Sequence, residues 1–220
     1  HLWPIRASDP HWVWHKAFGA YGTDNWMASA QYLRLFGALP DLETTVRCSQ
    51  FLQAEGLRYA NQAMRRFQWH RSACASWTYN EPWPNAAHGC IVEFYGRPKM
   101  AYHYARTAFA PVDVSAEYNS LLCHTGVPFP LKLFVTSTHP DLLHDCQFIA
   151  QAVDVRGPVY ARTNHILDVI PDVTRALGTW KLTLPAEADQ SVILVHLRLL
   201  DAQGAELSAQ TYTFGVTDPL

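Results

Sequence analysis

Aromatic and amide side chains are concentrated in the stretch Trp77-Thr-Tyr-Asn80-Glu81-Pro-Trp83-Pro. A tryptophan ring can stack on the apolar C–H face of a sugar, while an asparagine amide donates to and accepts from sugar hydroxyls. Trp77, Asn80 and Trp83 are therefore candidate carbohydrate-binding residues. A structural alternative stays open, in which the two tryptophans plug the end of a barrel and Asn80 caps a turn.

A second group of aromatic residues lies near the N-terminus, where Trp3, Trp12 and Trp14 follow one another closely. These rings could shape the same sugar pocket, and Trp3 is the candidate binding residue among them. They could equally form a hydrophobic loop that packs on the rim of a barrel. Both interpretations stay open.

Metal chemistry is not indicated by the spacing of histidines and cysteines. His11 and His15 have the i, i+4 spacing of two zinc ligands on one helix, but no glutamate follows His11 and Asp9-Pro10 favours a loop. The cysteines are odd in number and never spaced C-x-x-C, which argues against a zinc site or a disulfide framework. We predict no metal and no cofactor, and we expect five small buried hydrophobic residues: Cys48, Cys74, Cys90, Cys123 and Cys146.

The elements of the first half are expected to be mixed. Asp41, after Pro40, can cap a long helix that continues to about Phe67, and Asn25 can cap a shorter one that closes at Gly37. The small residues from Ala73 to Tyr79 predict a short, fully buried strand. A brief strand over 89–95 and a helix over 98–109 follow. In a (β/α)₈ barrel, the C-terminal ends of such strands form the active-site face.

The second half is predicted to consist of strands. Alternation of apolar and polar residues begins at Val112 and continues to Asn119, and Asp201-Ala-Gln-Gly204 is typical of a hairpin loop. Seven such strands fit a two-sheet immunoglobulin-like sandwich that serves as a scaffold. The expected ranges are 112–119, 131–137, 148–155, 165–170, 179–184, 192–200 and 207–214.

Composition also divides the chain. Residues 1–111 carry 11 Lys+Arg against 7 Asp+Glu, whereas residues 112–220 carry 6 against 12, and only Trp180 of the eight tryptophans lies beyond residue 83. This asymmetry predicts a domain boundary at 110/111, beside Pro111. The overall charge of −2 and the lack of a long apolar run give no reason to expect nucleic acid or a membrane as partner. The absence of an initial Met indicates a piece of a longer protein.

Several of these segments together resemble glycoside hydrolase family 2, most closely its β-mannosidase-like branch. A W-x-x-N-x-x-W-P turn and a Y-G-x-P-K-x-A-Y helix entry rarely coincide, so the combined motif is fairly specific. The matching segments are Cys48-Ser-Gln50, Arg65-Arg66, Trp77, Asn80, Trp83-Pro84, Tyr95-Gly-Arg-Pro-Lys99-Met-Ala-Tyr102 and Ala110-Pro-Val-Asp-Val-Ser115.

The resemblance implies a fold and an activity. Residues 1–110 would be the C-terminal segment of a (β/α)₈ TIM-barrel catalytic domain, and residues 111–220 the immunoglobulin-like β-sandwich. The enzyme would be a retaining exo-β-glycosidase with a glutamate acid/base and a glutamate nucleophile whose carboxyl groups lie about 5–5.5 Å apart. In that family both glutamates lie on earlier barrel strands, so we expect neither in this chain and expect the chain alone to be inactive.

Glu81 lies in a second recognisable motif. The sequence Thr78-Tyr-Asn80-Glu81-Pro82 also resembles the T-x-N-E-P motif of other barrel glycosidases, in which the glutamate is the general acid/base. The Trp-Pro and Tyr-Gly-Arg-Pro-Lys that follow fit instead the last barrel strand of family 2, where the acidic residue has no catalytic role. Glu81 is therefore interpreted mainly as a polar residue of the loop or of the substrate rim.

The expected partners are a carbohydrate substrate and the missing N-terminal part of the same enzyme, encoded by the same gene or by a separate one. Exo-β-glucosaminidase, β-galactosidase and β-glucuronidase are alternative specificities within the family. A non-catalytic carbohydrate-binding module is the alternative outside the enzyme class. The sequence predicts neither the sugar nor the cellular location.

Overall fold

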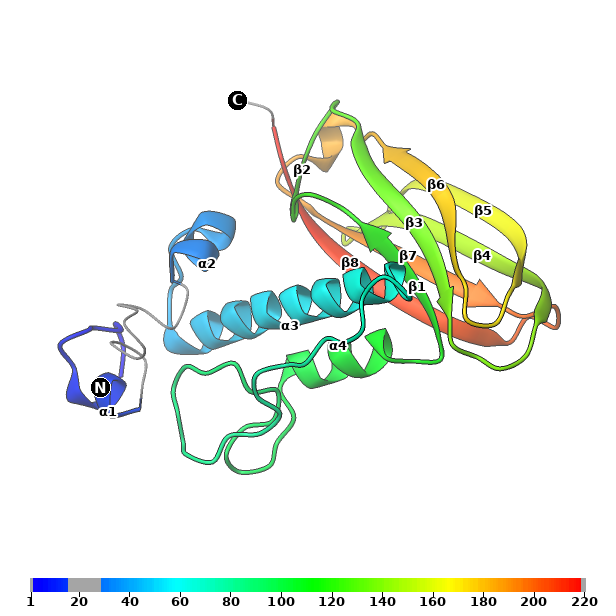
Figure 1. The fold of residues 1–220 in the computed structure, drawn as a ribbon. Coiled ribbons are helices and arrows are strands. Elements are labelled where there is room, and N and C mark those ends of the chain that lie inside the picture. Colours follow the sequence, from blue (N-terminus) through cyan, green and yellow to red (C-terminus); the bar gives the residue numbers. More distant parts are fainter. Residues whose placement is uncertain (1, 16–28, 219–220) are drawn as a thin grey trace. The chain divides into compact units, whose positions relative to one another are not determined.

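The computed structural model describes residues 2–15 and 29–218 (Figure 1). The chain divides into two compact units, one made of His1–Asn61 and Ala73–Arg106 and the other of Gln62–Ser72 and Thr107–Leu220. No helix among the described residues combines the length and the apolar character needed to cross a membrane. The expected domain boundary at 110/111 stays a prediction.

Four α-helices occur among the described residues: α1 (Pro10–Trp14), α2 (Ser29–Phe36), α3 (Leu42–Arg66) and α4 (Met100–Ala108). The predicted cap of α3 is confirmed, because Oδ1 of Asp41 accepts a hydrogen bond from the backbone N–H of Thr44 at 2.7 Å. Gly37 ends α2 with a φ of +73°, as its position predicted. The proposed capping residue Asn25 lies outside the described residues.

The first unit has a small core in which α3 packs against α4 and the segment around Ile91. Its buried members are Ala54, Ile91 and Ala101, and the small alanines allow close approach of the backbones. A buried ion pair joins Glu55 and Arg58 of α3 at 2.6 Å. The side chain of α3 residue Gln53 donates to the backbone carbonyls of Gly89 and Cys90 at 2.8 and 3.0 Å, which ties the following loop to the helix.

The prediction of a buried strand from Ala73 to Tyr79 is wrong for this structure. The segment is irregular and mostly exposed, and the nearest pairing is a single bridge between Asn80 and Val92. A strand of a parallel sheet needs hydrogen-bonded neighbours and covered faces. The described residues supply that bridge and two hydrogen bonds to the carbonyl of Tyr79 but no ladder along the segment, so small-residue composition alone does not make a strand here. The expected strand over 89–95 is likewise reduced to isolated bridges at Val92.

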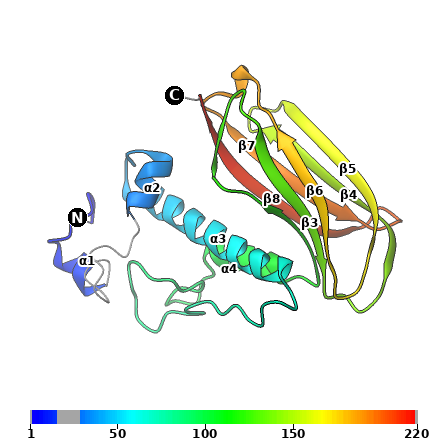
Figure 2. The same cartoon turned by 45° about the horizontal axis from the view of Figure 1, so that its top comes forward.

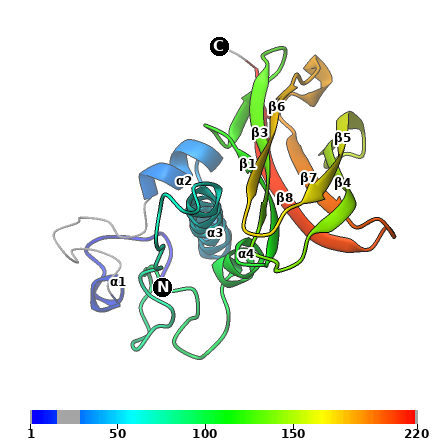
Figure 3. The same ribbon diagram turned by 45° about the vertical axis from the view of Figure 1, so that its right-hand side comes forward.

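The second unit contains two sheets, as predicted. Their strand orders are β1-β3-β6 and β2-β8-β7-β4-β5, and Figures 2 and 3 show the strands of the two sheets packed in layers. All seven expected strands are present, with ends shifted by a few residues, and β2 is an additional short strand parallel to β8. The bounds are β1 Val112–Glu117, β2 Leu122–His124, β3 Phe129–Ser137, β4 Leu143–Asp154, β5 Val159–Val169, β6 Thr174–Leu182, β7 Val192–Leu200 and β8 Glu206–Thr217.

The core of the second unit lies between these sheets. Along β7 and β8 buried residues alternate with more exposed ones, which is the period-two pattern of a strand with one covered face. The rings of Tyr118 and Phe129 both pack edge-to-face against Phe214, with centroids 5.1 Å away in each pair. The predicted hairpin loop is confirmed, because Gly204 has a φ of +86° and its N–H donates to the carbonyl of Asp201.

A buried polar network fixes the last turns of α3 to this unit. The hydroxyl of Tyr212 donates to Oε1 of Gln62 at 2.7 Å and accepts from the backbone N–H of Ala116 at 3.0 Å. Oδ1 of Asp113 accepts from Gln62 at 3.3 Å and from Gln210 at 2.9 Å. Polar groups buried in this way stabilise only when they are paired, so the network favours one placement of the helix end.

The cysteine prediction is partly confirmed. All five thiols are free, and Cys90, Cys123 and Cys146 are buried as small hydrophobic residues. Cys74 is exposed, and Cys48 is partly buried. The expectation of burial is wrong for Cys74 because it lies in the irregular segment that was predicted as a buried strand.

Candidate functional site

Three of the four predicted sugar-binding residues, Trp77, Asn80 and Trp83, lie in one exposed loop of the first unit. Trp77 is 78% exposed and Trp83 is 51% exposed, and Asn80 between them is also exposed. Tyr79 and Tyr95 are further exposed rings of the same unit. Several large aromatic rings exposed on one part of a protein are typical of a surface that binds a ligand or a partner.

Backbone hydrogen bonds hold this loop against the segment around residue 91. The N–H groups of Ile91 and Val92 both donate to the carbonyl of Tyr79, at 3.1 and 2.9 Å, and the N–H of Glu81 donates back to Val92 at 3.2 Å. Gly89 is needed for the close approach, because a Cβ at this position would lie 2.5 Å from the carbonyl oxygen of Trp77. Trp77 and Trp83 are thus presented by a loop with a defined backbone.

The N-terminal segment is attached to the same loop through His15. Its ring stacks on Trp83 with centroids 6.2 Å apart, its Nδ1 lies 2.5 Å from the carbonyl of Pro84, and its carbonyl accepts from the N–H of Ala86 at 2.8 Å. His11 lies in α1, whose cap Asp9 accepts from the His11 N–H at 2.9 Å. The segment that was expected to be a loop contains this short helix. The contacts of His15 hold the Trp83 ring in position.

The three N-terminal tryptophans have different environments. Trp12 is buried, and its indole N–H donates to the carbonyl of Leu2 at 3.2 Å. Trp3 is 38% exposed and Trp14 is 75% exposed. Trp12 is therefore part of the packing, and the sugar-binding role of Trp3 stays a prediction.

Glu81 is buried rather than presented to a ligand, with 6% of its surface exposed. Its Oε1 accepts from Nδ2 of Asn85 at 2.7 Å, and its Oε2 lies 2.9 Å from Nδ1 of His88. A general acid must come within hydrogen-bond reach of the bond that it protonates. This geometry favours the interpretation of Glu81 as a polar residue of the loop.

Sequence reasoning missed a cluster beside Glu81. The donor atoms of Glu81, His88 and Cys90 lie within 4.8 Å of one another, and Nζ of Lys99 is 3.1 Å from the sulfur of Cys90. The spacing His88-x-Cys90 is short enough to have been noticed in the sequence. Its proximity to Glu81 depends on how the loop folds back, and no familiar motif has this spacing.

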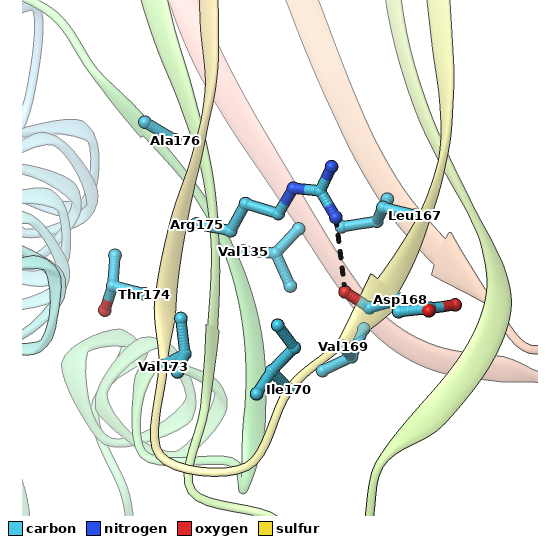
Figure 4. Close-up of a pocket in the computed structure, with 9 residues that line it drawn as sticks. All are labelled: Val135, Leu167, Asp168, Val169, Ile170, Val173, Thr174, Arg175 and Ala176. Atoms are coloured by element: carbon cyan, nitrogen blue, oxygen red, sulfur yellow. Dashed lines mark hydrogen bonds between the residues drawn. The ribbon is translucent and has the colours of Figure 1, made fainter.

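The second unit contains a separate cavity of about 330 Å³ between β5 and β6 (Figure 4). Its walls are mainly aliphatic, from Val135, Leu167, Val169, Ile170 and Val173. The polar contact drawn there joins the guanidinium of Arg175 to the backbone carbonyl of Asp168 at 3.5 Å. The remaining lining residues are Asp168, Thr174, Arg175 and Ala176.

Comparison with curated proteins gives partial matches to β-mannosidases. The chain is 27% identical over 189 residues to β-mannosidase B of Thermothelomyces thermophilus, which covers 77% of this chain and 22% of that protein. It is 35% identical over 78 residues to β-mannosidase B of Aspergillus niger, covering 34% of this chain and 9% of that protein. No family model matches the chain. The chain therefore spans less than a quarter of the length of these relatives.

Solved structures of a β-mannosidase and of an exo-chitosanase share the fold. The β-D-mannosidase of Dictyoglomus thermophilum aligns with a TM-score of 0.66 and 18% identity, over 85% of this chain and 22% of its own. The exo-chitosanase of Amycolatopsis orientalis aligns with a TM-score of 0.70 and 18% identity, over 94% of this chain and 24% of its own. The resemblance indicated by the motifs is confirmed: this chain is a partial match to the β-mannosidases and related enzymes of glycoside hydrolase family 2.

Proposed function

We propose that this chain is the C-terminal part of a retaining exo-β-glycosidase of the β-mannosidase type, which hydrolyses terminal β-linked sugars. In this proposal the chain contributes Trp77, Asn80, Trp83 and Trp3 to the sugar pocket. The two catalytic glutamates lie in the remaining part of the enzyme. The observation that carries the proposal is the match over 189 residues to a β-mannosidase of which the chain covers only 22%.

The exposed loop supports the sugar-binding role. Trp77 and Trp83 present apolar faces to solvent, and the Asn80 amide lies between them in the sequence. Stacking on the C–H face of a sugar and hydrogen bonding to its hydroxyls require these two kinds of group. The side chain of Glu81 in the same loop is buried, which supports the assignment of the catalytic carboxylates to another part of the enzyme.

The partial coverage of the relatives supports a place for the first unit in an incomplete barrel, because the chain covers only 22% of the β-mannosidase that it matches. Residues 1–110 would then be the end of a TIM-barrel domain, completed by the rest of the enzyme. In that setting the C-terminal end of the segment from Ala73 to Tyr79 would carry Trp77 and Asn80 to the active-site face.

The strand order supports an immunoglobulin-like domain for residues 111–220. A three-stranded antiparallel sheet packs on a larger, mainly antiparallel sheet in which β4, β7 and β8 are adjacent, and the connections from β1 through to β4 and from β5 through to β7 cross between the sheets. Such crossing connections are typical of this class of sandwich. The domain would act as a scaffold and not as a catalytic unit.

Hydrolysis of an aryl β-mannoside tests the proposal. The isolated 220-residue chain is expected to show no turnover, and turnover by that chain would contradict the assignment of both glutamates to another part. In the complete enzyme, Trp77→Ala or Trp83→Ala should lower kcat/KM by about tenfold or more, because a stacking surface is lost. Tyr95→Ala, which removes another exposed ring of the same unit, is the matched control and should change kcat/KM little.

A glucosamine-specific enzyme is a second candidate, favoured by the structural similarity to an exo-chitosanase at a TM-score of 0.70. Turnover of an aryl β-glucosaminide in preference to the β-mannoside by the complete enzyme would support it. A carbohydrate-binding module is the candidate from another class. Quenching of tryptophan fluorescence when the isolated chain is titrated with mannose oligosaccharides would support the module, and an unchanged spectrum would support an incomplete pocket.

A further inference from the structure

Three side chains of the first unit bring an oxygen, a nitrogen and a sulfur donor together. They are the carboxylate of Glu81, the imidazole of His88 and the thiol of Cys90, whose donor atoms lie within 4.8 Å of one another. Glu81 and Cys90 are buried, and the side chain of His88 is only 15% exposed. Surface carboxylates often cluster without binding a metal, but a buried group of three different donors is less common.

The spacing of these donors is close to that of a zinc site. Zinc lies about 2.0–2.2 Å from nitrogen and oxygen ligands and about 2.3 Å from sulfur, so tetrahedral ligands are about 3.3–3.6 Å apart. Here Oε2 of Glu81 and Nδ1 of His88 are 2.9 Å apart, and no donor pair exceeds 4.8 Å. An ion could reach all three after rotations of the side chains that move the donor atoms by about 1 Å or less.

The Glu81 carboxylate contacts both of the other donors. Oε1 accepts a hydrogen bond from Nδ2 of Asn85 at 2.7 Å, and the buried Oε2 forms an ion pair with Nδ1 of His88 at 2.9 Å. The thiol of Cys90 also interacts with this carboxylate. A cation among the three donors would take the place of these direct contacts.

The surroundings of Cys90 bear on how a cation would bind. Burial raises the pKa of the Cys90 thiol, the ammonium of Lys99 acts in the opposite direction, and Glu81 raises it further. Lys99 reaches the sulfur at 3.1 Å and the carbonyl of His88 at 3.4 Å. A metal ion must displace both the thiol proton and this ammonium, so Lys99 competes with the ion.

We propose that Glu81, His88 and Cys90 form a binding site for one divalent cation of the zinc type. A thiolate and an imidazole favour Zn²⁺ over Mg²⁺ or Ca²⁺, which prefer oxygen ligands. Three protein ligands leave a fourth position for water. The bound ion would link position 81 to positions 88 and 90 and so fix the loop that presents Trp83. The site does not depend on the proposed glycosidase activity.

Titration of the metal-free 220-residue chain with Co²⁺ tests the proposal directly. Tetrahedral Co²⁺ with a thiolate ligand gives an ultraviolet sulfur-to-cobalt charge-transfer band and intense visible bands, so the spectrum reports both geometry and sulfur ligation. We expect saturation at one Co²⁺ per chain and displacement by Zn²⁺. A titration without a charge-transfer band would overturn the proposal, whatever the variants do.

Substitutions assign the ligands. Cys90→Ser should abolish the charge-transfer band and weaken Zn²⁺ binding more than about 100-fold, because even residues that only orient ligands are worth about 10- to 100-fold. Cys74→Ser removes an exposed thiol of the same unit and should leave the band and the affinity unchanged. A band that survives in Cys90→Ser or disappears in Cys74→Ser would overturn the assignment.

Lys99→Gln should change the Zn²⁺ affinity in the direction opposite to Cys90→Ser. Removing the competing ammonium should tighten Zn²⁺ binding by about tenfold or more, since a positive charge about 4 Å from a divalent ion repels it appreciably even in a solvent of high dielectric constant. Unchanged or weaker binding in this variant would contradict the position of the ion next to Cys90. Because the Co²⁺ spectrum is measured on the unaltered chain, a variant that fails to fold does not remove the test.

Discussion

Substitution of Gly89 by alanine should disrupt the loop that carries the candidate sugar-binding residues. A Cβ at residue 89 would lie 2.5 Å from the carbonyl oxygen of Trp77, whereas carbon and oxygen atoms in ordinary contact are roughly 3.4 Å apart. The obstacle is backbone, which cannot rotate away as a side chain can. The loop must therefore move by about 0.9 Å, the difference between these two distances.

The size of the effect follows from this overlap. Forcing an extra methyl group into a packed site costs about 1–3 kcal/mol, so the free energy of unfolding of the first unit should fall by that amount in Gly89→Ala. Urea unfolding followed by tryptophan fluorescence measures it, because Trp77 and Trp83 lie in this loop. Hydrogen exchange of the Ile91 and Val92 amides should also accelerate, because both amides are bonded to Tyr79.

Gly56 provides a control of opposite sign. It lies within α3, and nothing is within 4 Å of the position that its Cβ would take. Gly56→Ala should therefore stabilise the chain by about 0.5–1 kcal/mol, because alanine is the better helix former. If Gly89→Ala is as stable as the unaltered chain while Gly56→Ala behaves as expected, the close approach of residue 89 to Trp77 is refuted.

Three further predictions concern the second unit. Tyr212→Phe should lower the free energy of unfolding by about 2–4 kcal/mol, because it leaves Gln62 and a buried backbone N–H of β1 without their partner; urea unfolding measures this. Hydrogen bonds from Arg156 hold the pKa of Asp154 well below its ordinary 3.8, so the stability that Asp154 contributes is present above about pH 5 and is lost as the pH falls. Asp154→Asn should therefore make acid unfolding less steep between about pH 5 and pH 2. Burial raises the pKa of Cys123 to about 12, so a thiol reagent at pH 8 should label the exposed Cys74 and spare Cys123 until the chain unfolds.

Each of these has a result that would contradict it. Tyr212→Phe with an unchanged urea midpoint would show that the network does not hold the end of α3. If acid unfolding of Asp154→Asn is as steep as that of the unaltered chain, this carboxylate does not contribute to the pH dependence of stability. Labelling of Cys123 at the rate of Cys74 in the folded chain would contradict the burial of Cys123.

The features predicted correctly from the sequence are those set by local patterns. The helix that follows Asp41 combines a capping side chain with helical periodicity, and both are local. The strands of the second unit show apolar alternation, which arises because one face of each sheet is covered. The short strand at Leu122–His124 was missed because three residues are too few to show a period.

The features predicted wrongly depend on partners distant in the sequence. The segment from Ala73 to Tyr79 has the composition of a buried strand, but a strand forms only where neighbours can pair with it. The cluster of Glu81 with His88 and Cys90 exists because the loop folds back through its bonds to Tyr79. Spacing along the chain does not show that the loop folds back, so the cluster was not found from the sequence.

A native mass spectrum of the protein isolated from its source tests the central claim most directly. If this chain is the C-terminal part of a β-mannosidase-like enzyme, its 24.9 kDa sequence will be found within, or bound to, a larger polypeptide that supplies the rest of the barrel. A folded monomer of 24.9 kDa, alone and without partner, would contradict the account.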